Sequence, residues 1–269
     1  MELGLKLKIE QIKKAVKAKQ SMLIAFSGGV DSSVVAALAF QALGEKALAV
    51  TVDSETLPPF ELENAIEVAR KIGIQHRIVK YNELNSEEFR RNPHDRCYYC
   101  KRSLLEVLTK LAREEGFNVI ADGTNADDYL AHRPGIKALR EFNVFSPLAE
   151  FSVSKAEVRA IARELNLPNA DKPSMACTAS RFPYGLEITK EKLDRVKQAE
   201  MFLFKMGFKQ VRVRDHDGIA RIEVLREDNQ AIIENSITIA RELRKLGYKY
   251  ITLDLEGYRP GSLDEVLSR

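Results

Sequence analysis

The sequence predicts an α/β fold with a doubly wound, mainly parallel sheet, followed by a smaller C-terminal α+β domain. Short apolar segments alternate with segments of helical periodicity through the first half, and strands separated by helices pair in parallel. After Pro168 the pattern changes to a proline-punctuated loop, a long helix and short alternating strands. We therefore expect one domain over residues 1–185 and a smaller substrate-binding or oligomerisation domain over residues 186–269.

The elements of the first domain follow from local patterns. Residues 5–19 carry apolar side chains at helical spacing, and helices are also expected over 32–43, 58–72, 101–115 and 154–165. Gly44 and Gly73 follow two of these helices, and Ser154 with Glu157 forms a capping box at another. Apolar runs predict buried strands over 22–26 and 47–52. A third and a fourth strand are expected over 75–81 and 118–121, with a short fifth strand over 144–145.

The second domain is expected to mix helices with short strands. Its helices are predicted over 191–206 and 229–246, and its strands over 210–214, 219–225 and 248–255.

Composition limits the classes of function. Of 269 residues, 45% are hydrophobic, which allows a well-packed core, and the net charge of +3 does not indicate a surface that coats nucleic acid. The first 20 residues lack the apolar core of a signal peptide and no apolar run reaches 18 residues, so we expect a cytoplasmic protein. Three cysteines indicate thiol, metal or cluster chemistry, or inert core residues.

A glycine motif lies between a buried strand and the start of a helix: Ser27-Gly28-Gly29-Val30-Asp31-Ser32. Glycines let backbone N–H groups turn toward one point, and the helix N-terminus adds a positive dipole end. No lysine stands where a Walker loop requires one, so the motif favours holding pyrophosphate over transferring a γ-phosphoryl group. The structural alternative is a glycine turn with a polar helix cap.

Two further positions follow predicted strands at the same sheet edge, where ligands of open α/β sheets bind. Asp53 follows the second strand and is a candidate contact to ribose or metal. The run 122–128 follows the fourth strand: Gly123 permits a tight turn, Thr124 and Asn125 can donate to phosphate, and Asp127 or Asp128 can bind Mg²⁺. Ordinary turn residues are the alternative for each.

The cysteines form a close pair and a distant third member. Cys97 and Cys100 are expected just before a helix, and Cys177 lies in the loop after the first domain's last helix. Three thiolates suit a 4Fe–4S cluster with one iron left open. Zinc would need a fourth ligand such as His94 or His132, and plain thiols are the remaining alternative.

Arginines supply candidate anion ligands near the cysteine loop. Alternation places Arg212 and Arg214 on one face of a strand, and with Arg181 they offer forked donors to phosphate and carboxylate groups. The alternative is an exposed basic strand face.

The glycine motif resembles the PP-loop of N-type ATP pyrophosphatases, a superfamily that includes GMP synthetase, NAD synthetase and tRNA thiolation enzymes. The resemblance implies an adenine nucleotide alpha hydrolase-like fold and cleavage of ATP between its α and β phosphates with Mg²⁺. Ser27, Gly28, Gly29 and Ser32 would hold the nucleotide, and Asp31 would hold the Mg²⁺–pyrophosphate. The product is an adenylylated substrate.

Three longer stretches, residues 92–101, 177–185 and 211–216, together resemble the LarE family of ATP-dependent sulfur transferases, over nearly the whole chain. The stretch containing Ser180 and Arg181 is the most specific. The resemblance implies adenylylation of a pyridinium-3,5-dicarboxylate mononucleotide and conversion to thiocarboxylates for a nickel-pincer cofactor. Ser180 and the three arginines would bind this substrate.

Within that family, members with a lone cysteine matching Cys177 give up its sulfur, whereas members with three cysteines are similar to this chain at Cys97, Cys100 and Cys177. The latter implies a 4Fe–4S cluster with a transferable sulfide. Glu200 and Glu223 resemble acidic positions near a metal, with surface carboxylates as the alternative. The resemblance also implies a homo-oligomer, with a hexamer as one form. No membrane or tRNA partner is expected. The sequence does not identify the sulfur donor.

Two other functions compete. A tRNA thiolation enzyme would share the loop and the cysteines, but is expected to carry extra zinc-ribbon cysteines or a basic extension. A non-catalytic nucleotide-binding protein would bind adenylate without releasing pyrophosphate.

Overall fold

The computed structural model describes residues 3–129, 134–173, 175–259 and 261–263, so His132 lies outside the described residues. The chain forms two compact units. The first comprises Met1–Ser54, Phe60–Asn82 and Asp95–Met175, and the second comprises Glu55–Pro59, Glu83–His94 and Ala176–Arg269. The boundary expected near residue 185 therefore falls inside the second unit, and the chain passes between units after residues 54, 59, 82, 94 and 175.

A four-stranded parallel sheet forms the centre of the first unit, as the alternation of apolar and helical segments predicted. Its strands are β1 (Met22–Ala25), β2 (Ala47–Ser54), β3 (Gln75–Tyr81) and β4 (Val119–Ala121), in the order β3-β2-β1-β4. The predicted fifth strand is wrong, because Phe145 makes only an isolated bridge to Ala121.

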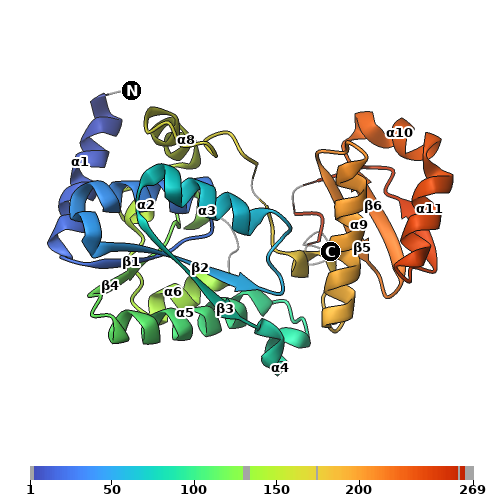
Figure 1. The fold of residues 1–269 in the computed structure, drawn as a ribbon, viewed down its shortest axis with the longest axis horizontal. Helices are drawn as coiled ribbons and strands as arrows, with labels where there is room; N and C mark the ends of the chain where they lie inside the picture. Colours follow the sequence, from blue (N-terminus) through green and yellow to red (C-terminus); the bar gives the residue numbers. More distant parts are fainter. Residues whose placement is uncertain (1–2, 130–133, 174, 260, 264–269) are drawn as a thin grey trace. The chain divides into compact units, whose positions relative to one another are not determined.

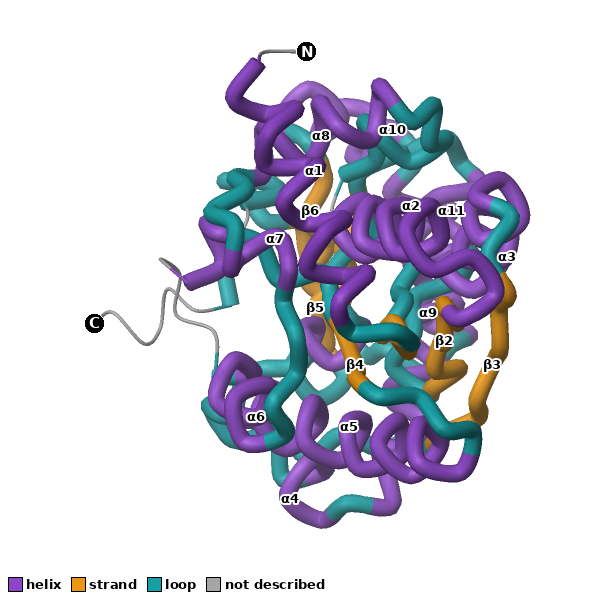
Figure 2. Tube along the Cα trace, turned by 90° about the vertical axis from the view of Figure 1, so that its left-hand side faces the viewer, coloured by secondary structure: helices purple, strands orange, loops and turns teal. Residues whose placement is uncertain are grey.

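Helices cover both faces of this sheet (Figure 1). One face carries α1 (Leu3–Ala18), α2 (Val30–Leu43), α3 (Glu61–Ile72) and α8 (Lys155–Glu164), and the other carries α5 (Arg96–Glu114) and α6 (Gly135–Glu141). Figure 2 shows α2 and α3 on one side of β2, β3 and β4, with α5 and α6 on the other. A short α7 (Pro147–Glu150) follows β4 and α6 in the chain.

Alternation along β1 explains why both faces are buried. Ile24 packs into the hydrophobic cluster that includes Val34 of α2, whereas the adjacent Leu23 packs into the cluster that includes Leu105 and Leu108 of α5. Successive side chains of a strand point to opposite faces, so a continuous apolar run is required where both faces carry helices.

The second unit contains a small mixed sheet of β5 (Val211–Asp215), β6 (Ile219–Val224) and β7 (Tyr250–Leu253). β5 pairs antiparallel with β6, and β7 pairs parallel with β6. The core of this unit lies within residues 199–253 and includes Leu203, Val213 and Leu243. The sheet packs with α9 (Lys190–Lys205), α10 (Asn229–Glu234) and α11 (Ser236–Lys245), and an earlier segment adds α4 (Glu87–Arg90).

The single helix expected over residues 229–246 is wrong, since the structure has two helices that meet at Asn235. The Asn235 side-chain amide donates to the carbonyl of Ala231 (2.8 Å), and α11 begins at the next residue. Asparagine bonds local backbone groups readily and therefore interrupts helices.

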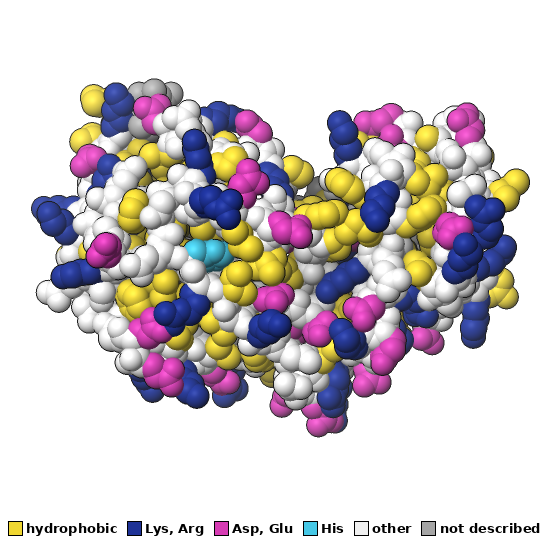
Figure 3. All heavy atoms as spheres, viewed as in Figure 1, with side chains coloured by type: hydrophobic (Ala, Val, Ile, Leu, Met, Phe, Trp, Pro, Cys, Tyr) yellow, Lys and Arg dark blue, Asp and Glu magenta, His cyan; other side chains and the backbone are white. Residues whose placement is uncertain are grey.

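No helix among the described residues has the length and apolar character needed to cross a membrane. On the face drawn in Figure 3, basic and acidic side chains are intermingled, in keeping with a net charge of only +3.

Candidate active site

The glycine motif forms the turn between β1 and α2, as predicted. The Gly29 carbonyl accepts hydrogen bonds from the Ser33 N–H (3.0 Å), the Ser32 hydroxyl (3.1 Å) and the Ser33 hydroxyl (2.8 Å). This carbonyl is therefore directed into the helix. The first N–H groups of a helix have no intrahelical acceptor, so the helix tip can receive an anion.

Gly28 is fixed by a residue that the sequence analysis missed. Its carbonyl accepts from the side-chain amide of Asn169 (2.7 Å), which also donates to Ser33 Oγ (2.8 Å). Gly28 has φ +72°, and a Cβ there would lie 2.8 Å from the Cα of Ala65 in α3. Only glycine allows this approach of α3 to the loop.

The end of β1 is tied to its neighbours by Thr51 of β2. The Thr51 hydroxyl donates its one hydrogen to the carbonyl of Phe26 (2.8 Å) and lies 2.8 Å from Nε2 of His76. The hydroxyl oxygen therefore accepts a hydrogen bond from Nε2, which carries a proton. Burial lowers the pKa of His76 below its ordinary 6.5.

Asp31, the carboxylate of the motif, is bridged on both oxygens. Asn125 Nδ2 donates to Oδ1 (3.0 Å), and the ammonium group of Lys155 pairs with Oδ2. Lys155 is the first residue of α8, directly after the capping-box residue Ser154, and both side chains of the Lys155–Asp31 pair are partly exposed. Thus a lysine from a helix 124 residues away lies at the carboxylate of a loop whose own sequence has none.

The segment after β4 lies against the tip of α2. A Cβ on Gly123 would lie 2.5 Å from the backbone nitrogen of Ser32, which no larger residue can satisfy without displacement. The buried carboxylate of Asp122 accepts from the Thr124 hydroxyl (2.6 Å), the Thr124 N–H (3.2 Å) and Ser146 Oγ (2.7 Å). Thr124, predicted to donate to phosphate, uses its hydroxyl within this loop.

The aspartate candidates Asp53, Asp127 and Asp128 also lie in the first unit. Asp127 accepts from the Lys155 N–H (2.8 Å), and Asp128 accepts from the Asn125 N–H (3.1 Å). Asp53 stands near the carboxyl end of β2, opposite Lys80 in β3. Asp31 and Asp127 thus share Asn125 and Lys155 as neighbours, whereas binding of Mg²⁺ by any of these residues stays a prediction.

Cys97 and Cys100 lie within the first two turns of α5 rather than in the segment before it, because the helix begins at Arg96. Residues three apart lie on one helix face, so the two thiols project from the same side of the turn. Cys97 is exposed and Cys100 is partly exposed. Among the described residues, no three His, Cys, Asp or Glu side chains are grouped to hold a metal ion.

Cys177 belongs to the second unit, and a meeting of the three thiols stays a prediction. It directly precedes the short 3₁₀ helix Thr178–Arg181, and the residue is partly exposed. Arg181 is fully buried, and Glu200 of α9 binds it through both carboxylate oxygens (2.8 and 3.0 Å).

Arg212 and Arg214 do lie on β5, but the alternative of an exposed basic strand face is wrong, since both are buried. Arg214 is forked onto the fully buried Glu223 (3.0 and 2.8 Å), and Arg212 lies over the ring of Tyr258. Burial, and then the charge of Arg181, lowers the pKa of Arg212. The carboxylates of Glu200 and Glu223 are both paired with arginine. Binding of Mg²⁺ by either residue remains a prediction.

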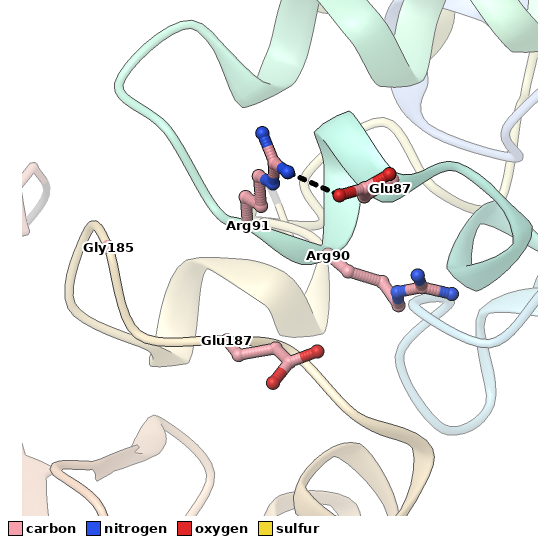
Figure 4. Close-up of a pocket in the computed structure, with 5 residues that line it drawn as sticks. All are labelled: Glu87, Arg90, Arg91, Gly185 and Glu187. Carbon is pink, nitrogen blue, oxygen red and sulfur yellow. Dashed lines mark hydrogen bonds and ion pairs between the residues drawn. The ribbon is translucent and has the colours of Figure 1, made fainter.

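A cavity of about 500 Å³ lies beside α4 in the second unit (Figure 4). Its lining is charged and of mixed sign: Glu87, Arg90, Arg91, Gly185 and Glu187. Arg91 is ion-paired with Glu87, and the figure shows Arg90 and Glu187 on the neighbouring segments. Of these residues the sequence analysis had included only Gly185, at the end of the stretch 177–185.

The chain is similar to known proteins over almost its whole length. A family model described as asparagine synthase matches residues 7–236. The pyridinium-3,5-bisthiocarboxylic acid mononucleotide synthase of Lactiplantibacillus plantarum is 35% identical, over 95% of this chain and 93% of that protein. Uncharacterized proteins of Synechocystis sp. (45% identical, 97% and 98% covered) and Methanocaldococcus jannaschii (33%, 94% and 97%) are also similar.

Proposed function

Since the chain belongs to the asparagine synthase family of PP-loop enzymes, as an ATP-pyrophosphatase-type sulfur transferase, we propose that it converts the carboxylates of a pyridinium-3,5-dicarboxylate mononucleotide into thiocarboxylates. One observation carries the ATP-dependent half of this proposal. In the glycine loop, the Gly29 carbonyl accepts a hydrogen bond from α2 and the Gly28 carbonyl accepts one from Asn169. Lys155 is paired with the loop's carboxylate, Asp31. The printed name of the relative from Lactiplantibacillus plantarum supports the substrate.

The first step activates a carboxylate, which is a poor electrophile because its charge repels nucleophiles. A carboxylate oxygen of the substrate attacks the α-phosphorus of ATP, the bond to the β-phosphate oxygen breaks, and pyrophosphate departs. The α2 tip and Lys155 stabilise the negative charge that develops on this leaving group. Magnesium, when bound, neutralises the same phosphates, and Asp31, Asp127 and Asp128 are the residues proposed to hold it.

The second step brings sulfur to the acyl carbon and releases AMP. Cys97, Cys100 and Cys177 are proposed to hold a 4Fe–4S cluster, and their thiolates are suitable donors, with Cys97 and Cys100 on one face of a helical turn. Such a cluster, when bound, supplies an iron without a protein ligand at which sulfide can be delivered. Cys177 would then be retained rather than consumed.

Two measurements test this proposal. Protein purified without oxygen should contain iron and acid-labile sulfide, and ATP with Mg²⁺ should release pyrophosphate only when the pyridinium dicarboxylate is present. Cys97→Ser should abolish iron binding and sustained thiocarboxylate formation. Pyrophosphate release that depends on the pyridinium dicarboxylate should stay intact. Absence of pyrophosphate release from the wild-type chain would refute the proposal, and full repeated turnover by Cys97→Ser would refute the cluster.

A further inference from the structure

The backbone around Cys177 is held by an unusual number of donors. The Cys177 carbonyl accepts from the Ser180 N–H (3.0 Å), the Ser180 hydroxyl (2.8 Å) and Arg181 Nη1 (3.2 Å). A carbonyl oxygen offers two lone pairs, so three donors fully occupy it. Cys177 as a residue is partly exposed. Its peptide is thus fixed although the residue reaches the surface.

Arg181 supplies much of this fixation and is fully buried. Its Nε and Nη2 donate to the two oxygens of Glu200, while Nη1 donates to the carbonyl of Ala176 (2.8 Å), to that of Cys177 and to Ser180 Oγ (3.0 Å). All three nitrogens of the guanidinium group therefore bond to protein atoms. This leaves the fork with no nitrogen unengaged for a substrate anion.

Two further anchors hold the residues that follow Cys177. Arg214 donates from Nη1 to the carbonyl of Ser180 (2.6 Å), while its other nitrogens bind Glu223. The Thr178 N–H donates to the carbonyl of Thr56 (2.9 Å). Thr56 is itself held through its N–H by the buried carboxylate of Glu83 (3.1 Å).

We propose that Arg181 is a positioning residue for Cys177, rather than a ligand of the substrate, and that Glu200 is the counter-ion that orients its guanidinium group. The inference rests on the proposed function in one respect, namely that Cys177 handles the transferred sulfur. A displacement of about 1 Å at a reacting group can cost two orders of magnitude in rate. When misplaced sulfur attacks the acyl-adenylate too slowly, water attacks it instead and returns the free acid and AMP.

Arg181→Lys tests this role because lysine keeps the charge but not the fork. We expect the ratio of thiocarboxylate formed to pyrophosphate released to fall at least tenfold, while the KM for the pyridinium dicarboxylate in pyrophosphate release stays within twofold of wild type. Ser180→Ala, a milder change that removes the hydroxyl between Arg181 and Cys177, should lower the ratio by a smaller factor. A raised KM with an unchanged ratio would identify Arg181 as a substrate ligand and overturn the proposal.

Arg195→Lys is the matched control. Arg195 donates from Nε and Nη2 to one oxygen of the fully buried Asp215 (2.9 and 2.6 Å) in the same unit. Within the part of the chain that the structure describes, it makes no hydrogen bond or ion pair with residues 176–181. The control should lose comparable thermal stability and keep the wild-type ratio of products. If Arg195→Lys lowered that ratio as much as Arg181→Lys, a general loss of stability would explain both, and the positioning role would be wrong.

A second readout needs no substrate and therefore separates this proposal from the proposed function. Amide hydrogen exchange over residues 176–181 should be at least tenfold faster in Arg181→Lys than in wild type and unchanged in Arg195→Lys. Unchanged exchange in Arg181→Lys would overturn the positioning role even if sulfur transfer were established. Faster exchange confined to that variant would support it even if the wild-type chain formed no thiocarboxylate.

Discussion

At the scale of single residues, the pairing of Lys155 with Asp31 joins two groups that ATP would separate. Both side chains are partly exposed, so phosphates and a divalent cation can compete for them. In the proposed mechanism, Asp31 takes the cation and the ammonium group moves to the phosphates. The lysine could not be predicted from the loop's own sequence, because the contact spans 124 residues and depends on how α8 packs on α2.

Replacing Lys155 with methionine should lower the rate of pyrophosphate release with the pyridinium dicarboxylate by about 100-fold. This is the usual effect of removing one charge-stabilising group. Lys172→Met is the control, since Lys172 pairs with Glu61 (2.6 Å) in the same unit. That variant should retain most of the activity. The two variants are compared in a continuous pyrophosphate assay, and equal losses would contradict a specific role for Lys155.

Two histidines should make the fold sensitive to acid. Burial lowers the pKa of both His76 and His216 below the ordinary 6.5, and the charge of Arg221 adds to the effect at His216. The unfolded chain therefore binds protons that the folded chain resists, so the free energy of unfolding should be highest above pH 6.5 and fall as pH drops through the lower folded values. Urea unfolding at pH 7.5 and pH 5.5 measures the fall, which should shrink in His76→Gln; an identical fall would contradict this assignment.

At the scale of elements, the sequence predicted features that depend on the pattern within one segment. It did not predict contacts between segments. The capping box of Ser154 and Glu157 is present, and β3 has the predicted bounds. By contrast, apolar periodicity alone did not predict the start of α5 at Arg96 or the break at Asn235, where a side chain bonds the local backbone. Asn169 was missed for the same reason, since its bond to Gly28 spans 141 residues.

The close approach of the β4 loop to α2 gives an element-level prediction. Gly123→Ala places a methyl group where only 2.5 Å is available beside the Ser32 nitrogen, so the loop must shift from the helix tip. We expect a loss of about 1–3 kcal/mol in the free energy of unfolding and weaker ATP binding, measured by urea titration and calorimetry.

Gly4→Ala is the corresponding control, because Gly4 lies in α1 and a Cβ there would meet nothing within 4 Å. Alanine should leave ATP binding unchanged and raise stability by about 0.5–1 kcal/mol through helix propensity. A Gly123→Ala protein as stable as the Gly4→Ala protein would show that the loop adapts freely.

At the scale of the whole molecule, the second unit contains a buried ion pair as well as an apolar core. The hydrophobic core of the second unit lies within residues 199–253, which explains why the sequence pattern indicated a boundary near 185. Arg181, the counter-ion of Glu200, lies before that boundary. No local pattern predicts such a long-range charge pairing.

A pair of fragments tests this division. Fragment 186–269 retains Glu200 without Arg181, whereas fragment 176–269 keeps the pair, and an unpaired buried charge costs about 3 kcal/mol. Glu200→Gln should therefore stabilise the shorter fragment and destabilise the longer one, as measured by urea midpoints. The same sign in both fragments would show that the pair does not stabilise the unit.

The five passages of the chain between the units also bear on recombination among relatives. A chimaera joined at residue 175 would combine the C-terminal part of one parent with Glu55–Pro59 and Glu83–His94 of the other. Those short segments supply Thr56 and Glu83, which anchor the peptide after Cys177. Functional hybrids should therefore inherit all three segments from one parent, so that exchange at a single crossover is selected against.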